Sequence, residues 1–125
     1  MFLHKSEIKD ILALPQISTE MGYCRAFVRK AINDSLLSSY LQNIRKAPKS
    51  LQKYYHPYAF LYDRELSETA ENLLRGIESC VVFNLPYNSS LLNSWQDKSL
   101  ELSGCKLYKI VYSSLTPKSF KILII

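Results

Sequence analysis

Apolar residues recur at steps of three and four along residues 18–46, the spacing of one buried face on an amphipathic helix. Ser18 or Thr19 is placed to cap this helix, and Glu20 in the first turn complements its dipole. The polar run 33–35, Asn-Asp-Ser, interrupts the pattern, so two consecutive helices are predicted. Their apolar positions are Met21, Cys24, Val28, Ala31 and Ile32 before the break, and Leu36, Leu37, Tyr40, Leu41 and Ile44 after it.

Shorter helices are expected on either side of this pair. Ser6 caps a segment over 7–14 that Pro15 ends, and Pro48 fits the first turn of another, which Pro57 ends. A later helix over 66–79 is predicted to start near Ser67, with Glu68 and Glu71 in its first turns. The apolar face of this later helix comprises Leu66, Ala70, Leu73, Leu74 and Ile77.

The character of the chain changes at Gly104. Residues 105–112 and 119–125 are β-prone with partial alternation, so an irregular tail, β-prone or disordered, is expected after an all-α body. The apolar run 121–125 is much shorter than the roughly 20 residues that span a bilayer.

Composition is that of an ordinary globular domain: 125 residues, 47% hydrophobic and 22% charged. The net charge is +5, but residues 1–95 hold 11 basic against 9 acidic side chains, which is weak evidence for a nucleic-acid partner. Three glycines leave no Gly-rich phosphate loop.

Candidate chemistry is sparse. Cys24, Cys80 and Cys105 are scattered, as suits a reducing compartment, and none lies at zinc-site spacing from another ligand. Cys24 fits the core stripe, and a dyad of Cys80 with His56 has no local support. We therefore predict a non-enzymatic protein with no cofactor and no metal. The acids Asp63, Glu65, Glu68 and Glu71 are interpreted as a solvated helix face, with Glu71 and Arg75 spaced for a salt bridge.

Basic residues form the one candidate binding surface. They form two groups along the chain. The group over 45–53 contains no acidic residue, and the group over 25–30 lies upstream on the predicted helix pair. A partner protein, an acidic membrane or RNA could use such a face, whereas a solvated helix surface is the plainer alternative. Arg25 and Arg29 are also candidates for holding the fold together. The predicted partner-binding residues are Arg25, Arg29, Lys30, Arg45, Lys46, Lys49 and Lys53.

Residues 21–33, Met-Gly-Tyr-Cys-Arg-Ala-Phe-Val-Arg-Lys-Ala-Ile-Asn, resemble the most recognisable helix of RUN domains. There a Gly-Arg-Gly-Arg-Ala-Trp-Ile-Arg-type pattern runs into Ala-Leu-Asn. The block 54–65 is similar to the family's Tyr-Tyr-x-Pro-x-Ala-Leu-Leu-type motif, and 73–77 with 82–85 is similar to its last helix and exit. Phe27 stands where Trp is common, and Tyr23-Cys24 replaces an Arg-Gly pair, which removes one positive charge.

This resemblance covers about 18–95 and implies a partial RUN-type helical bundle, matching the C-terminal part of the domain. The expected organisation is a short helix and linker over 1–17, a RUN-like helical domain over 18–103 and a divergent tail over 104–125. Helices of a partial bundle are expected to leave an apolar face exposed, a setting for instability or association.

The resemblance also implies a function. RUN domains are associated with small GTPases of the Rab, Rap and Arl types and with motor adaptors, in vesicle and endosome–lysosome traffic. An effector or adaptor is therefore expected, cytoplasmic and peripheral on endosomal or other vesicle membranes. The alternatives are a truncated isoform without independent function, and a basic helical protein that binds an acidic membrane surface or RNA.

Overall fold

The computed structural model describes residues 5–94 as α-helices joined by short connections, with no β-strand in that range. The predicted all-α body is thus confirmed, whereas the predicted tail over 104–125 lies outside the described residues. No helix within 5–94 is both long and apolar enough to cross a bilayer. The elements are α1 (Lys5–Leu12), α2 (Glu20–Asn33), α3 (Leu37–Arg45), α4 (Pro48–Gln52), α5 (Arg64–Cys80) and the 3₁₀ helices η1 (Phe60–Tyr62) and η2 (Ser90–Asn93).

Local signals set most helix ends. Thr19 caps α2 by accepting a hydrogen bond from the Gly22 amide at 3.0 Å. The predicted break after Asn33 is confirmed, and Ser35 turns the chain with a left-handed φ of 56°. Pro48 opens α4 as expected.

The start of α5 differs from the prediction. Asp63, and not Ser67, is the N-cap: its carboxylate accepts a hydrogen bond from the Leu66 amide at 2.9 Å. Ser67 lies inside the first turns of α5, where its hydroxyl donates back to the Asp63 carbonyl at 2.6 Å. The helix therefore begins about one turn earlier than the expected start at Ser67.

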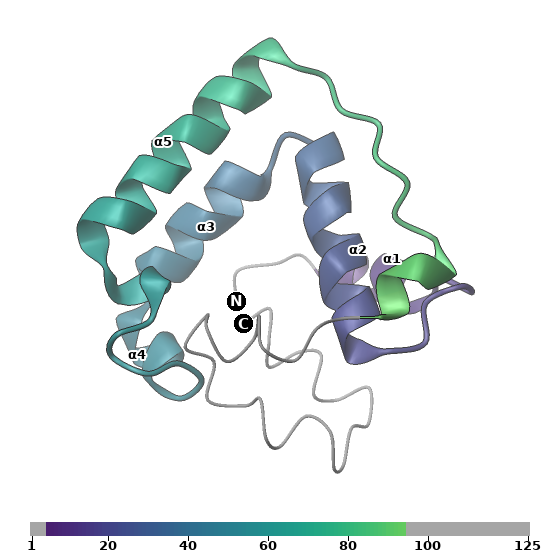
Figure 1. Ribbon diagram of the computed structural model, residues 1–125, viewed down its shortest axis with the longest axis horizontal. Coiled ribbons are helices and arrows are strands. Elements are labelled where there is room, and N and C mark those ends of the chain that lie inside the picture. Colours follow the sequence, from purple (N-terminus) through teal and green to yellow (C-terminus); the bar gives the residue numbers. More distant parts are fainter. Residues whose placement is uncertain (1–4, 95–125) are drawn as a thin grey trace.

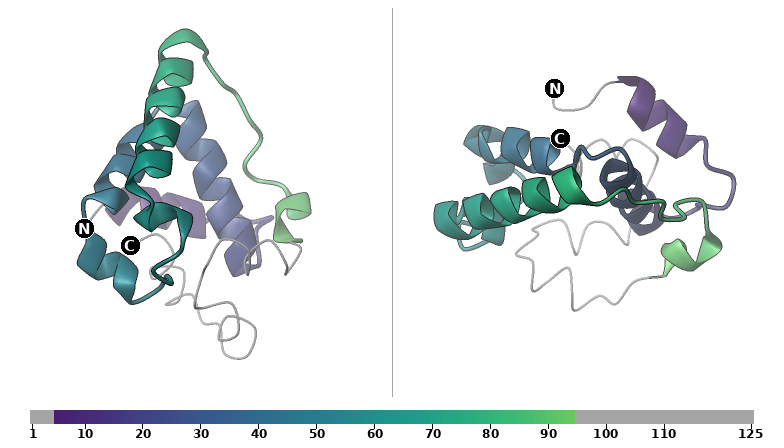
Figure 2. Two further views of the ribbon diagram at one scale, coloured as in Figure 1. Left: turned by 60° about the vertical axis from the view of Figure 1, so that its left-hand side comes forward. Right: turned by 90° about the horizontal axis from the view of Figure 1, so that it is seen from above.

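The helices form two limbs that meet at the turn after α2 (Figure 1). One limb is α2. The other is the antiparallel pair of α3 and α5, which lie side by side in both Figure 1 and Figure 2 and make the largest contact between elements. From the end of α5, the extended segment 81–89 crosses back to α2, where η2 packs on the first turns.

The buried apolar core lies at the α2 limb. It comprises Ile8 and Ile11 of α1, Ile17, Ala26 of α2 and Leu92 of η2. The rings of Phe27 and Tyr40, with centroids 5.3 Å apart, connect this core to α3. Cys24 packs against the same cluster, as its place in the helix pattern predicts. The helix α5 contributes no residue to this core.

The helix α5 is instead turned so that a polar side faces α3. Ser67 and Glu71 are buried, at 0% and 2% exposure. Leu66, Leu73 and Ile77 from the predicted apolar face are 55%, 64% and 46% exposed. The exposed apolar face expected of a partial bundle is therefore present on α5.

Gly22 allows η2 to approach α2 closely. A Cβ at this position would lie 2.4 Å from Asn93 Oδ1 and 2.9 Å from Ile17 Cγ2, closer than nonbonded atoms tolerate. Asn93 Oδ1 at the same place accepts hydrogen bonds from the backbone amides of Ser18 and Thr19, at 2.9 and 3.3 Å. The glycine is thus required by packing and not by backbone conformation.

We expect Gly22→Ala to lower stability by about 1–2 kcal/mol, because overpacking outweighs the gain in helix propensity. Gly76→Ala is the matched control. A Cβ at Gly76 meets nothing within 4 Å in the described part of the chain, so that change should raise the free energy of unfolding by about 0.5–1 kcal/mol. Urea denaturation of both variants measures the two values, and equal effects would contradict the packing role of Gly22.

Candidate protein-interaction surface

The seven predicted partner-binding residues lie in two regions of the structure. Arg25, Arg29 and Lys30 belong to α2, whereas Arg45 ends α3. The remaining three are Lys46, which follows α3, Lys49 within α4, and Lys53, which follows α4. The structure therefore divides what the sequence suggested was one basic face.

The two arginines of α2 bind the segment that returns from α5. Arg25 Nη1 donates to the carbonyls of Leu92 and Ser94 at 3.2 and 2.5 Å. Arg29 Nη1 donates to the Pro86 carbonyl at 2.9 Å. These bonds satisfy carbonyls of an irregular segment that has no ladder of its own. The alternative prediction for Arg25 and Arg29, that they hold the fold together, is confirmed.

Asn33 extends this attachment in a way that the sequence did not reveal. Its amide nitrogen donates to the Leu85 carbonyl at 2.9 Å, and its amide oxygen accepts from the Leu85 N–H at 2.7 Å. The Asn33 side chain thus satisfies both the N–H and the carbonyl of Leu85, as a neighbouring backbone would in a regular element. No local pattern marks Asn33 or Asn93 for such roles, because their partners lie more than 50 residues away.

Lys30 is held by two acids. Its Nζ lies 2.5 Å from Asp34 Oδ2 and 3.4 Å from Glu7 Oε2. The hydrogen bond to Asp34 is the main reason that the pKa of Lys30 is raised above its ordinary value. Because Glu7 belongs to α1, the charge of Lys30 helps to hold α1 against α2.

Arg45 belongs to a buried polar cluster centred on Glu71. The Glu71 carboxylate accepts from Arg45 Nη2 at 2.5 Å, from Gln42 Nε2 at 2.8 Å and from Arg75 Nη2 at 2.5 Å. The predicted Glu71–Arg75 bridge is confirmed, but the prediction that Glu71 is solvated is wrong. Its position on the helix faces α3, where side chains compensate the buried charge. The hydrogen bond from Arg45 is the main cause that lowers the pKa of Glu71.

A second carboxylate fastens the other end of α5. Glu78 accepts from the Ser38 amide at 2.9 Å and from the Ser38 hydroxyl at 2.5 Å. Ser38 lies in the first turn of α3, where free backbone N–H groups and the helix dipole favour an anion. Together, Glu71 and Glu78 hold α5 antiparallel to α3.

Lys46, Lys49 and Lys53 remain as an exposed group, called here the lysine corner. Within the described range 5–94, none of the three takes part in an ion pair. Lys53 Nζ lies 5.4 Å from the ring centroid of Tyr54, a cation–π contact that leaves the charge at the surface.

Exposed aromatic residues follow directly in the chain. Tyr58 is 76% exposed and stacks on His56 with ring centroids 5.2 Å apart, and Phe60 is 44% exposed. The hydroxyl of Tyr62 donates to the Pro48 carbonyl at 3.4 Å, which holds this block beside α4. Cationic and aromatic side chains thus gather at the α4 end of the molecule.

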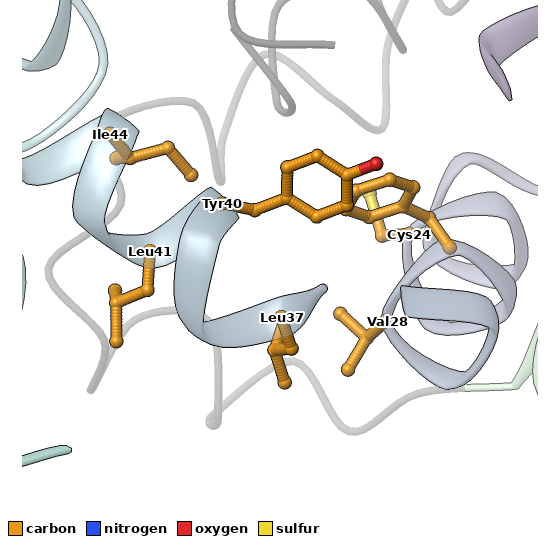
Figure 3. Close-up of a pocket in the computed structure, with 7 residues that line it drawn as sticks. Cys24, Val28, Leu37, Tyr40, Leu41 and Ile44 are labelled. Atoms are coloured by element: carbon orange, nitrogen blue, oxygen red, sulfur yellow. The ribbon is translucent and has the colours of Figure 1, made fainter. Parts of the chain in front are cut away.

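An apolar groove runs between α2 and α3 (Figure 3). Its volume of about 170 Å³ is smaller than the roughly 300–1,000 Å³ of ordinary small-molecule sites. Its walls are Cys24, Phe27, Val28, Leu37, Tyr40, Leu41 and Ile44. These are packing side chains with no acid–base pair among them, and residues 5–94 contain no cluster of metal-binding side chains.

A family model described as RUN domain matches residues 2–89. The matched range is more than half of the chain, and it contains the five α-helices of the described residues, the Glu71 cluster and the lysine corner.

Replacing Arg25 should weaken the fold. We expect Arg25→Met to lower the free energy of unfolding by about 2 kcal/mol, because carbonyls of 91–94 lose a charged donor. Thermal unfolding measures this loss. The control is Arg64→Met, since the Arg64 side chain is 88% exposed and should contribute little. An unchanged midpoint for Arg25→Met would contradict the structural role.

Replacing Glu71 should have a pH-dependent effect. The pKa of Glu71 is lower in the folded state than in the unfolded chain. The Glu71 carboxylate therefore contributes fully to the free energy of unfolding above the unfolded pKa of about 4.3, and this contribution is lost as pH falls through the folded-state pKa. We expect Glu71→Gln to cost about 3 kcal/mol at pH 7. The difference in the free energy of unfolding between the variant and the wild type should shrink as the pH is lowered.

Chemical denaturation over a series of pH values tests this expectation. Glu65→Gln is the matched control, since Glu65 is an exposed glutamate on the same helix. A difference for Glu71→Gln that stays constant from pH 7 down to pH 3 would show that charge on Glu71 is not what stabilises α5.

Proposed function

Because the chain belongs to the RUN domain family, we propose that it binds the GTP-loaded form of a small GTPase of the Rab, Rap or Arl type. Its role is that of a non-enzymatic effector or adaptor in vesicle or endosome–lysosome traffic. It works in the cytoplasm and at the surface of endosomal or other vesicle membranes, with motor adaptors as further partners.

The lysine corner is the observation that carries this proposal. Of the seven basic residues in the original prediction, Arg25, Arg29, Lys30 and Arg45 are engaged within the chain. The other three lie exposed and without an acidic partner in the described part of the chain. A GTPase switch region is ordered by the γ-phosphate, so a surface that contacts it binds the GTP state selectively.

Charge and aromatic area make complementary contributions at such a surface. Exposed lysines steer association with an acidic patch and make its rate sensitive to salt. Tyr58 and Phe60 add apolar contact area, and tyrosine is enriched among the residues that dominate binding energy. Both kinds of side chain lie within the range 46–60.

Charge reversal of the lysine corner tests the proposal. The triple variant Lys46→Glu, Lys49→Glu, Lys53→Glu should bind its GTPase at least tenfold more weakly and with less salt dependence, since repulsion replaces steering. The measurement is a pull-down and titration against Rab, Rap and Arl proteins in GTP- and GDP-loaded states.

A second variant controls for net charge. Lys9→Glu with Arg64→Glu reverses two exposed charges elsewhere and should leave binding nearly unchanged. Circular dichroism establishes that each variant is folded. If the triple variant binds as the wild type does, the lysine corner is not the contact surface, and if no GTP-loaded protein binds, the proposed function is wrong.

A further inference from the structure

The outward side of α5 carries a regular apolar stripe. Its members follow one another at steps of four, three, four and three residues, the spacing of the contact positions in a coiled coil. The stripe, called here the outer stripe, consists of Leu66, Ala70, Leu73, Ile77 and Cys80. Figure 1 shows α5 along the outer edge of the molecule, with α3 on its inner side.

Most of the outer stripe is exposed, with Ala70 partly buried, whereas Ser67 and Glu71 on the side toward α3 are buried. Leu73, at its centre, is 64% exposed, and Cys80, at its end, is an exposed free thiol. Beyond α5 the apolar surface continues through Val81 and Val82, which are 44% and 96% exposed. An apolar surface of this continuity on a soluble domain usually marks an interaction site.

We propose that a second copy of this chain covers the outer stripe, so that two α5 helices pack antiparallel with Leu73 opposite Leu73. In this register Leu66 of each copy faces Cys80 of the other, and Ala70 lies level with Gly76, next to Ile77. A stripe with alternating steps of four and three is self-complementary, because the knobs of one helix fit the holes of its copy.

Charge on α5 favours the same occupant. The stripe and its neighbouring positions Thr69 and Gly76 carry no charge. Glu71 is neutralised on the α3 side, and Glu68 lies 3.9 Å from Arg64 of its own helix. Two copies therefore meet without like charges at the contact, and an antiparallel arrangement also sets the two helix dipoles head to tail.

Gly76 supplies a separate reason to expect a helix at this face. A glycine within a helix costs about 1 kcal/mol relative to alanine, and no heavy atom of residues 5–94 lies within 4 Å of the place of a Cβ at Gly76. Such a position allows the backbone of another helix to approach closely. Nothing among residues 5–94 makes that approach.

The stripe is short, and this sets the expected strength. Two heptads and the adjoining valines form a contact at the small end of specific interfaces, which corresponds to a dissociation constant on the order of micromolar. A reversible monomer–dimer equilibrium is expected, not a permanent dimer.

Sedimentation equilibrium of the full chain at a series of concentrations tests this directly. The wild type should fit a monomer–dimer equilibrium, and Leu73→Glu should raise its dissociation constant at least tenfold. Leu91→Glu is the matched control, because Leu91 is 80% exposed but lies on η2. A wild type that stays monomeric to several hundred micromolar, open-ended assembly, or equal weakening by Leu91→Glu would overturn the proposal.

Gly76→Gln separates packing from folding. A Cβ at position 76 meets nothing among the described residues, and glutamine raises helix propensity, so the variant should stay folded, with a higher unfolding midpoint when dilute. Weaker dimerisation by at least fivefold is expected, because glutamine occupies the space that a second helix needs. Unchanged dimerisation would overturn the close approach at Gly76.

The orientation has its own test. Residues 66 and 80 are about 21 Å apart along α5, at 1.5 Å per residue, too far for a disulfide within one chain. In a Leu66→Cys variant, mild oxidation should join the introduced thiol to Cys80 of another copy, as read by peptide mapping. A dominant Cys80–Cys80 bond would instead show parallel packing. Dimerisation and GTPase binding use different residues, so each can fail without the other.

Discussion

The buried carboxylate of Glu71 holds the middle of α5 against α3, and with Glu78 it sets which side of the helix faces inward. The inner side of α5 offers few large apolar groups, so burial of hydrocarbon contributes little there. A buried carboxylate without donors would oppose this packing, but three donors from Arg45, Gln42 and Arg75 compensate it. Because its polar side is inside, the apolar side of the helix faces out.

Four arginines of this chain and the three lysines of the lysine corner have different roles. Arg25, Arg29, Arg45 and Arg75 all bind carbonyls or a carboxylate within the fold. The planar guanidinium presents several donors in a fixed geometry, which suits irregular backbone and a buried acid. A lysine carries one compact, strongly hydrated charge, and those of the lysine corner keep it at the surface.

Features governed by neighbours in the chain could be predicted from the sequence. Thr19 as a cap, the break after Asn33 and Pro48 at the start of α4 are local, and each is confirmed. Periodicity also identified the apolar face of α5, but it cannot say which neighbour a helix turns toward. For α5 that choice depends on Gln42 and Arg45, which lie more than 25 residues before Glu71 in the chain. The role of Asn93 likewise depends on partners far away in the sequence. The structural roles of Arg25 and Arg29 were equally hidden from local patterns, since their acceptors lie in 86–94.

The closing of the core by η2 has a consequence for the order of folding. Ile8 and Ile11 from the start of the described chain share a core with Leu92, and Asn93 fastens the residues before α2 across more than 70 positions. Contacts between α3 and α5, by contrast, join residues 26–40 positions apart. During synthesis on a ribosome, all residues of the α3–α5 contact have emerged before η2, so this pair can form before the core is complete. The helices made earliest, α1 and α2, gain their full packing only after residue 93 has emerged.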